Sequence, residues 1–314
     1  MRRVALLPRP SARVGLLRGF ATASKPLHMV FGASSIPHPD KALKGGEDAF
    51  FSDDSVGAFG VADGVGGSAT KKVDPGLFSR ELLRRCHSAL GQPSDAKISH
   101  ALQAASAEKL TLGGSSTLLL GQLEPSTHVL RLLNLGDSGA MLLRPSVRRF
   151  PSGSFLWPRA VLRSIEQTHA FNTPYQVGAR DFAHAAMQMD ELCTVVQEGD
   201  VLVAATDGVL DNLFDQTIQV TVAKCLDRLR ATEPRAVQAA VDELAGEIAR
   251  EANAVGLKQD DKDVRTPFEA AAASEGFQFL GGKLDDVAVV CGVVCSGERP
   301  PSRVLSNFET TAAA

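Results

Sequence analysis

The apolar positions of the chain fall into two kinds of segment with different periods. Short apolar runs, which predict strands, lie at residues 47–51, 58–62, 115–120, 201–205 and 287–295. Apolar stripes at helical spacing, which predict helices, lie at residues 75–90, 97–110, 215–230 and 234–254. Because strands and helices come in blocks and do not alternate strictly, the pattern favours an α+β sandwich over a parallel, doubly wound sheet.

The segments between these blocks are more polar. Residues 128–134 and 140–143 predict a hairpin around the turn at residues 136–139. The stretches without a regular period, which predict irregular chain, are residues 28–46, 144–160, 256–283 and 297–314. We expect the last of them to be a disordered tail. The basic, proline-rich stretch 144–160 predicts a solvated surface loop, and docking of a substrate is its alternative role.

Several carboxylates stand directly beside predicted strands. They are Asp63, Asp137, Asp207 and Asp285, with Glu47 and Asp48 at the start of a further strand. A short turn joins that strand to the one ending at Asp63, which should bring Glu47 or Asp48 close to Asp63. Carboxylate oxygens suit Mg²⁺ or Mn²⁺, whereas His and Cys ligands would suit zinc. The sequence therefore predicts that these acids meet and hold two hard cations.

Two cations about 3.5–4 Å apart can share a bridging hydroxide and clamp a phosphoryl group. Asp63 is the best candidate to bridge them, and the peptide carbonyl of Gly64 could add a ligand because glycine lets an ion approach the backbone. The remaining expected ligands are Glu47 or Asp48 on one side and Asp207 and Asp285 on the other.

Each Asp-Gly pair taken alone has a simpler interpretation, because Asp-Gly is a frequent turn dipeptide. This applies to Asp63-Gly64 and Asp207-Gly208, and the turn that contains Asp137 is by itself an ordinary hairpin turn. Only the whole set, with each member next to an apolar strand, favours a metal centre. We interpret Asp53-Asp54 and Asp260-Asp261 as solvated loop charges.

The composition of the chain argues against several classes of function. The chain is 44% hydrophobic and 22% charged, as in ordinary globular proteins, and its net charge of −3 argues against a nucleic-acid partner. None of the five cysteines forms a C-x-x-C pair, which argues against a disulfide framework or a zinc site. No apolar run reaches the roughly 18 residues of a membrane span. We expect a monomer without a membrane span.

The first 27 residues differ from the rest, because they are rich in arginine and contain no acidic residue. This composition is typical of an organellar transit peptide, and a flexible basic tail is the alternative. Arg18-Gly19-Phe20-Ala21 is similar to a matrix-processing site with cleavage after Phe20. We therefore expect the mitochondrial matrix, with a plastid as the alternative compartment.

Other catalytic motifs are missing from the sequence. It contains no G-x-x-x-x-G-K-[ST] phosphate loop, no G-x-S-x-G elbow and no Cys-x₅-Arg pair. The seven histidines are scattered, and His169 is the one that we keep as a candidate.

Six motifs follow one another in a fixed order along the chain. They are Gly46-Glu47-Asp48-Ala49, Val61-Ala62-Asp63-Gly64-Val65-Gly66-Gly67, Gly114-Ser115-Ser116-Thr117, Leu135-Gly136-Asp137-Ser138, Ala205-Thr206-Asp207-Gly208-Val209-Leu210-Asp211-Asn212 and Lys283-Leu284-Asp285-Asp286-Val287. In these motifs the chain resembles the metal-dependent Ser/Thr protein phosphatases of the PPM family, the type 2C phosphatases.

The resemblance implies an α+β fold over residues 28–296: a four-layer α-β-β-α sandwich of two mainly antiparallel sheets flanked by helices. It implies a centre of two Mg²⁺ or Mn²⁺ ions, with Asp63 and Asp207 indispensable for catalysis. The implied ligands are Asp63 as the bridge, the Gly64 carbonyl, Asp207 and Asp285 on one metal, Glu47 on the other, Asp48 as an outer ligand, and Asp137 near a third, weaker metal position.

The chain departs from the family pattern at two places. Many type 2C enzymes carry an arginine that grips the phosphate a few residues before the Glu-Asp pair, where this chain has Lys41, Leu43 and Lys44. A lysine supplies the charge but not the bidentate fork of arginine. Many also have a histidine directly after the Asp-Gly pair as a proposed general acid, where this chain has Val65. We therefore name no general acid.

Three details, at residues 63–67, 169–176 and 207–212, resemble the mitochondrial PTC-seven-like branch of the family. The resemblance implies hydrolysis of phosphoserine and phosphothreonine in mitochondrial matrix proteins, by in-line attack of a metal-bound hydroxide and without a phosphoenzyme. One alternative is a catalytically weak pseudophosphatase that acts as a binding module. The other is a hydrolase of small phosphate esters.

Overall fold

The fold is described from a computed structural model, which covers residues 25–66, 74–91, 98–107, 113–150, 153–178 and 182–309. The predicted transit peptide, apart from its last residues, and the predicted cleavage after Phe20 lie outside the described residues. Within them, no helix is long and apolar enough to cross a membrane.

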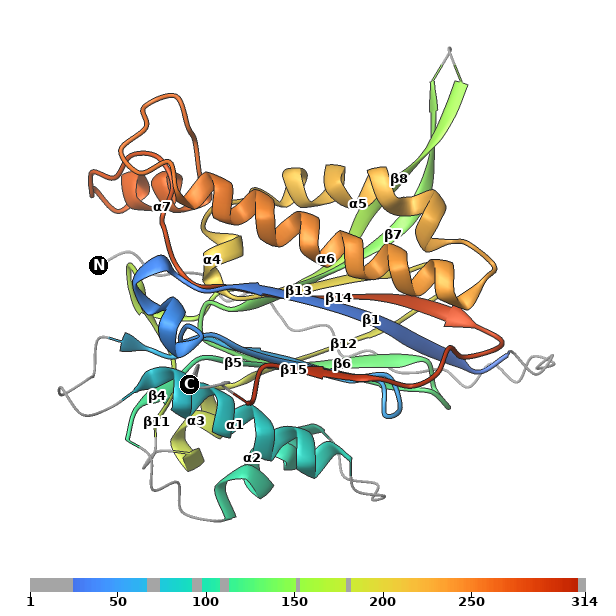
Figure 1. The fold of residues 1–314 in the computed structure, drawn as a ribbon, viewed down its shortest axis with the longest axis horizontal. Coiled ribbons are helices and arrows are strands. Elements are labelled where there is room, and N and C mark those ends of the chain that lie inside the picture. The colour runs from blue at the N-terminus through green and yellow to red at the C-terminus, as the bar shows by residue number, and fades with distance from the viewer. Residues whose placement is uncertain are drawn as a thin grey trace, which may run out of the picture.

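Two antiparallel sheets stacked face to face form the centre of the fold (Figure 1). The five-stranded sheet has the order β1 (Leu27–Ile36), β14 (Val287–Ser296), β13 (Val201–Ala205), β7 (Gly139–Phe150) and β8 (Gly153–Arg163). The six-stranded sheet has the order β12 (Asp190–Val195), β6 (Val129–Leu135), β5 (Leu118–Glu124), β3 (Ala58–Ala62), β2 (Ala49–Asp53) and β15 (Val304–Ser306). Two small sheets pair β9 (Thr168–Ala170) with β10 (Thr173–Pro174) and β4 (Ser115–Ser116) with β11 (Val177–Gly178).

Helices cover both outer faces of this pair of sheets (Figure 1). The five-stranded sheet carries α5 (Asp215–Leu229) and α6 (Pro234–Gly256), and the six-stranded sheet carries α1 (Pro75–Leu90), α2 (Ile98–Ala107) and α3 (Phe182–Gln188). The shorter helices are η1 (Pro39–Lys44), α4 (Asp207–Leu210) and α7 (Pro267–Ser274). The expected four-layer α-β-β-α sandwich of the α+β class is confirmed.

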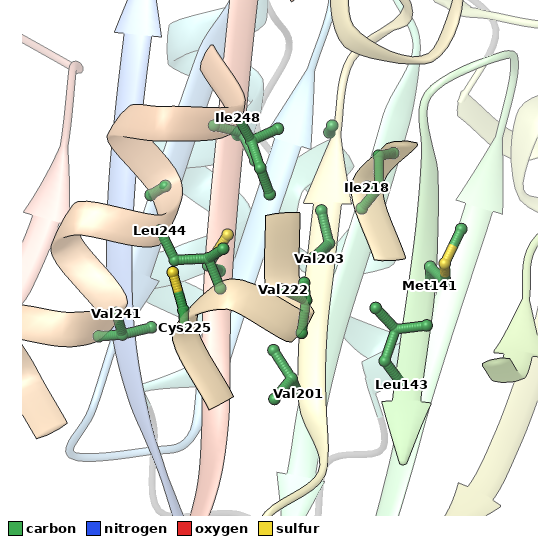
Figure 2. Packing of buried hydrophobic residues seen from close by; sticks show 14 of the residues in the cluster. Met141, Leu143, Val201, Val203, Ile218, Val222, Cys225, Val241, Leu244 and Ile248 are labelled. Atoms are coloured by element: carbon green, nitrogen blue, oxygen red, sulfur yellow. The ribbon is translucent and has the colours of Figure 1, made fainter. Parts of the chain in front are cut away.

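Each central strand is buried on both faces. The molecule therefore has three apolar layers: the first between the five-stranded sheet and α5 and α6, the second between the two sheets, and the third between the six-stranded sheet and α1 and α2. In β13, Val201 and Val203 point toward α5 and α6, and Leu202 points into the space between the sheets. Figure 2 shows Val241, Leu244 and Ile248 of α6 in the first of these layers. These residues belong to the apolar stripe that the sequence predicts for core packing, and full burial of each such side chain contributes about 1.5–3 kcal/mol.

The predicted hairpin at residues 128–143 is wrong. β6 pairs with β5 and β12 in the six-stranded sheet, whereas β7 pairs with β13 and β8 in the five-stranded sheet. The turn that contains Asp137 therefore carries the chain from one sheet to the other. The parts of the two strands that adjoin the turn, residues 132–135 of β6 and 139–143 of β7, are buried on both faces, so the pattern of the sequence does not say which strand lies beside which.

The predicted loop at residues 144–160 is also wrong. β7 and β8 pair from Met141–Arg163 to Phe150–Gly153, with a shift of register between Leu142 and Leu143, and their outer part projects beyond the helix layer (Figure 1). At the base of this hairpin Arg144 forms two hydrogen bonds, of 2.8 and 2.7 Å, with the fully buried carboxylate of Asp200. Pro145 and Pro158 lie opposite each other, beyond the part of β7 that pairs with β13, so neither takes a central position in the sheet.

Three more segments differ from the prediction. The expected irregular lead-in contains β1, which pairs with β14 along ten residues, and the expected loop-rich stretch 256–283 contains α7. The expected disordered tail contains β15, which pairs with β2. The Asn307 side chain accepts a hydrogen bond from Phe50 N (2.9 Å) and donates one to Asp48 O (2.9 Å). These long-range bonds, which the local sequence does not encode, hold the polar tail in place.

The interpretation of Asp53 and Asp54 as solvated charges is wrong as well, because both are buried. Asp53 Oδ2 lies 2.8 Å from His87 Nε2, and Asp54 Oδ1 accepts a hydrogen bond from Phe31 N (3.1 Å). Burial raises the pKa of Asp54 despite its backbone donors. Asp54 thus connects β1 to the end of β2, which joins the two sheets.

Candidate active site

The predicted carboxylates come from separate segments that meet at one edge of the sandwich. Asp63 follows β3, and Asp207 follows β13 as the first residue of α4. Asp137 lies in the turn between β6 and β7, and Asp285 lies two residues before β14. The structure therefore brings together residues that are up to 222 positions apart in the sequence.

Strand register explains this convergence. Ala205, at the end of β13, lies opposite Gly139 at the start of β7 and opposite Val289 near the start of β14. The ends that carry Asp207, Asp137 and Asp285 are therefore neighbours in the five-stranded sheet. In the six-stranded sheet Ala62 lies opposite Ala49, which puts Glu47 and Asp48 beside Asp63.

Gly64 allows the segment that contains Asp63 to lie close to the segment that contains Glu47. Its N–H donates a hydrogen bond to the Glu47 carbonyl at 3.2 Å, as the expected proximity requires. A Cβ at this position would lie 2.6 Å from the Pro75 carbonyl oxygen and 2.8 Å from that of Glu47. The close contact that demands glycine here is thus with the protein backbone, which differs from the reason that the sequence suggested.

The carboxylates repel one another in this buried edge. Burial raises the pKa of Asp63 well above its usual value, and the charges of Asp207 and Asp48 raise it further. Burial and the charge of Asp286 likewise raise the pKa of Asp48, although the Thr206 hydroxyl donates to its Oδ2 at 2.7 Å. A site that accumulates negative charge in this way favours binding of a cation.

Three more carboxylates at this edge, those of Asp137, Asp211 and Asp285, also have raised pKa values. Burial, followed by the charge of Asp207, raises the pKa of Asp137 to about 7. Burial raises the pKa of Asp211 to about 8, against the opposing charge of Lys283. Burial and the charge of Asp207 also raise the pKa of Asp285.

Three of these buried carboxylate oxygens have no hydrogen-bond partner: Oδ1 of Asp48, Asp137 and Asp207. A buried polar atom without a partner costs about 1–3 kcal/mol, and more if it is charged. Hard divalent cations bind through such oxygens. The donor set therefore fits Mg²⁺ or Mn²⁺ on chemical grounds.

The carboxylates do not surround a common centre. Among the described residues, no group of three or more His, Cys, Asp or Glu side chains is positioned to hold a metal ion. Two lysines contact these carboxylates instead. Lys41 Nζ lies 2.6 Å from Glu47 Oε2, 3.0 Å from Asp286 Oδ2 and 3.7 Å from Asp285 Oδ1. Burial opposes the charge of Lys41, but its bonds with Glu47 and Asp286 raise its pKa.

Lys283 is the second lysine of the site, and its side chain is only 15% exposed. Its Nζ lies 2.6 Å from both Asp207 Oδ2 and Asp211 Oδ2 and 3.6 Å from Asp285 Oδ2. Burial opposes the charge of Lys283, but Asp207 and Asp211 raise its pKa well above the usual value.

Sequence reasoning missed Lys283, Asp211 and Asp286 as site residues. Asp211 follows Asp207 by four positions, and this spacing would have placed both on one face of a helical turn. Asp286 accepts hydrogen bonds from His38 N (2.7 Å) and Glu47 N (3.1 Å), so it holds the η1 segment against the start of β14. No local signal distinguishes it from its neighbour Asp285.

A cavity of about 400 Å³ opens beside Asp137 and Asp211. The 168–172 segment and α7 supply most of its remaining lining. His169, our histidine candidate, lies in this lining. The centroid of its ring is 4.0 Å from the centroid of the Tyr175 ring. The cavity provides room for part of a substrate next to the carboxylates.

The chain is similar to known proteins over most of its length. The family model of stage II sporulation protein E (SpoIIE) matches residues 58–263. The chain is 32% identical over 306 residues to probable protein phosphatase 2C 26 of Arabidopsis thaliana, covering 92% of this chain and 93% of that protein. It is 36% identical to probable protein phosphatase 2C 55 of the same plant over 88% of this chain, but it spans only 54% of that relative.

Solved structures give a consistent result. The photosystem II phosphatase PBCP is 29% identical, with a TM-score of 0.69, over 84% of this chain and 98% of that chain. The catalytic domain of the serine/threonine phosphatase PstP, solved with two manganese ions, is 18% identical with a TM-score of 0.52, over 86% of this chain and 100% of that chain. The second likeness is one of fold.

Proposed function

Because the chain belongs to the protein phosphatase 2C family, we propose that it hydrolyses phosphoserine and phosphothreonine in proteins with the help of two Mg²⁺ or Mn²⁺ ions. The observation that carries this proposal is the group of buried carboxylate oxygens without hydrogen-bond partners on Asp48, Asp137 and Asp207. They lie at one edge of the sandwich, beside a cavity that can receive a substrate.

We assign each carboxylate a role. Asp63 is the bridging ligand, and the Gly64 carbonyl, Glu47, Asp207 and Asp285 are the other ligands. Asp48 is an outer ligand, and Asp137 lies at the third, weaker metal position that the resemblance implies. When bound, the cations would lower the pKa of water and neutralise charge on the phosphoryl group. Thr206 supports this arrangement, because its hydroxyl donates to Asp48 and also accepts the Ala288 N–H at 3.0 Å. It thereby connects the ligands of the two sheets.

Lys41 is our candidate for the positive charge that meets the phosphate. It lies between Glu47 and Asp286 at the same edge, with its side chain 32% exposed. Of the other two residues in this stretch, Leu43 is 95% exposed, and Lys44 lies 3.9 Å from Asp74 with a side chain that is 73% exposed. A lysine there attracts a phosphate as a point charge, without the bidentate geometry of arginine.

Two related functions remain as alternatives, a pseudophosphatase and a hydrolase of small phosphate esters. The test uses the full chain with Mn²⁺, Mg²⁺ or EDTA, and compares a phosphothreonine peptide, a free phosphometabolite and p-nitrophenyl phosphate. We expect metal-dependent release from the peptide that is lost in EDTA and in Asp63→Asn. Release from the metabolite alone would indicate the small-ester hydrolase. No release from a folded sample with any metal would indicate the pseudophosphatase.

We propose that residues 1–27 direct the chain to the mitochondrial matrix, where it acts on phosphorylated proteins as a monomer. The composition of this segment supports an organelle. The likeness to a photosystem II phosphatase supports the plastid alternative. Residues 1–27 fused to a fluorescent protein would show the compartment, because mitochondrial and plastid markers differ in the same cell. Light scattering on the purified chain tests the monomer.

A further inference from the structure

The buried ammonium group of Lys283 lies among several carboxylates on one side of the site. Its Nζ contacts Asp207 and Asp211 at 2.6 Å each, and the ring centroid of Phe268 lies 4.9 Å away. The contacts with carboxylates are charge-assisted hydrogen bonds, and the aromatic face adds a cation–π interaction. The ammonium group is thus held by three groups from two separate segments.

The backbone of Lys283 is fixed as firmly as its side chain. Its N–H donates to Asn212 Oδ1 at 2.9 Å, and its carbonyl accepts from Asn212 Nδ2 at 2.7 Å. Asn212 is itself buried and bonded to the Gly208 carbonyl at 2.9 Å. The position of the ammonium group relative to α4 is therefore built into the fold.

The carboxylates around Lys283 have oxygen atoms that the ammonium group does not contact and that can bind a further cation. Asp207 and Asp137 each retain a buried oxygen, Oδ1, without a hydrogen-bond partner. Lys283 joins Asp211 to Asp207, because its Nζ contacts both carboxylates. Without the lysine, these three acids would form a buried anionic cluster on the cavity side of the site, of the composition that a hard divalent cation binds.

We propose that Lys283 is a permanent, protein-supplied cation of this site, which occupies the place that a third divalent cation would otherwise take among Asp137, Asp207 and Asp211. The inference rests on the proposed two-cation function. It assigns Lys283 a positioning role: the residue limits the site to two exchangeable cations and orients Asp207 toward them.

Lys41 does not have this property, although it also contacts acids of the site. Its nearest partners are Glu47, at 2.6 Å, and Asp286, at 3.0 Å. Asp286 also accepts hydrogen bonds from His38 N and Glu47 N and is therefore a structural anchor. The side chain of Lys41 is twice as exposed as that of Lys283, at 32% against 15%. We expect a third cation only where Lys283 is removed.

The test counts bound Mn²⁺ directly, independently of activity. The full chain and its variants are dialysed against Mn²⁺, and the bound metal per chain is measured by elemental analysis. Lys283→Met removes the charge at similar length, and Lys283→Arg retains it. Lys262→Met, at an exposed lysine, is the matched control. Circular dichroism identifies variants that fail to fold, and Lys283→Gln replaces Lys283→Met in that case.

We expect two Mn²⁺ per chain for the wild type, Lys283→Arg and Lys262→Met, and three for Lys283→Met. Adding Asp211→Asn to Lys283→Met should return the number to two. Equal numbers in the wild type and the folded charge-removed variant would overturn the inference, as would three ions in the wild type. No Mn²⁺ in the wild type but one in Lys283→Met would support the inference and contradict the proposed two-cation function.

Discussion

Asn212 connects the two segments that carry Asp207 and Asp285, so its removal tests how the site is held together. It follows α4, is only 3% exposed, and makes three side-chain hydrogen bonds. Its amide donates to the carbonyls of Gly208 (2.9 Å) and Lys283 (2.7 Å), and its Oδ1 accepts the Lys283 N–H (2.9 Å). Asn212→Ala removes all three bonds and adds no clash.

The expected cost follows from these bonds. A hydrogen bond contributes about 0.5–1.5 kcal/mol net, so three give a loss of about 1.5–4.5 kcal/mol in the free energy of unfolding. Asn212→Asp should cost at least as much at neutral pH, because a carboxylate oxygen would then face the two carbonyl oxygens. Its cost should fall in acid, where the protonated group can again donate one bond.

Urea unfolding of the metal-free chain, followed by circular dichroism, measures these values. Asn253→Ala on the half-buried side of α6 makes the same chemical change and should stay within about 0.5 kcal/mol of the wild type. A loss below about 1 kcal/mol for Asn212→Ala would refute the reasoning, since the three bonds would then not hold the two segments together.

Three further predictions concern charge. Asp63→Asn or Asp207→Asn should nearly abolish turnover while circular dichroism stays unchanged; near wild-type rates in either would exclude the proposed site. Because the folded-state pKa of Asp137 is raised to about 7, the folded state keeps a proton that the unfolded state loses, so stability falls as pH rises. For the metal-free chain this contributes a loss of about 2 kcal/mol between about pH 5 and pH 7. Urea titrations should show this slope in the wild type and a flatter one in Asp137→Asn; equal slopes would contradict it. Arg144→Ala leaves the buried Asp200 without its ion-pair partner and should cost about 3–5 kcal/mol, measured against exposed Arg159→Ala.

Local pattern was sufficient to identify most regular elements. α1 and α6 lie where the apolar stripes predict them, and β13 and β14 lie where the uninterrupted apolar runs predict them. The reason is that the spacing of apolar residues reports which side of an element is buried. The four carboxylates that follow or precede such strands could be found in the same way, because a strand end and its turn are adjacent in sequence.

Pattern could not assign strands to sheets. β6 and β7 are consecutive and their adjoining ends are both apolar, yet they belong to different sheets. A strand that is buried on both faces shows no alternation, so its sequence does not identify its neighbour. The polar segment of β15 was missed for a related reason, since β2 and the bonds of Asn307 hold it in place.

The family motifs, the α+β class and the principal acids, Asp63 and Asp207, can thus be read from the chain without its fold. The groups that compensate the charge of those acids become known only from the folded structure. Lys283 lies 76 positions from Asp207, and Asp286 lies 239 positions from Glu47, so no local spacing relates them. An ion pair depends on distance in space, and that distance is fixed only when the two sheets stack and their strand ends meet at one edge.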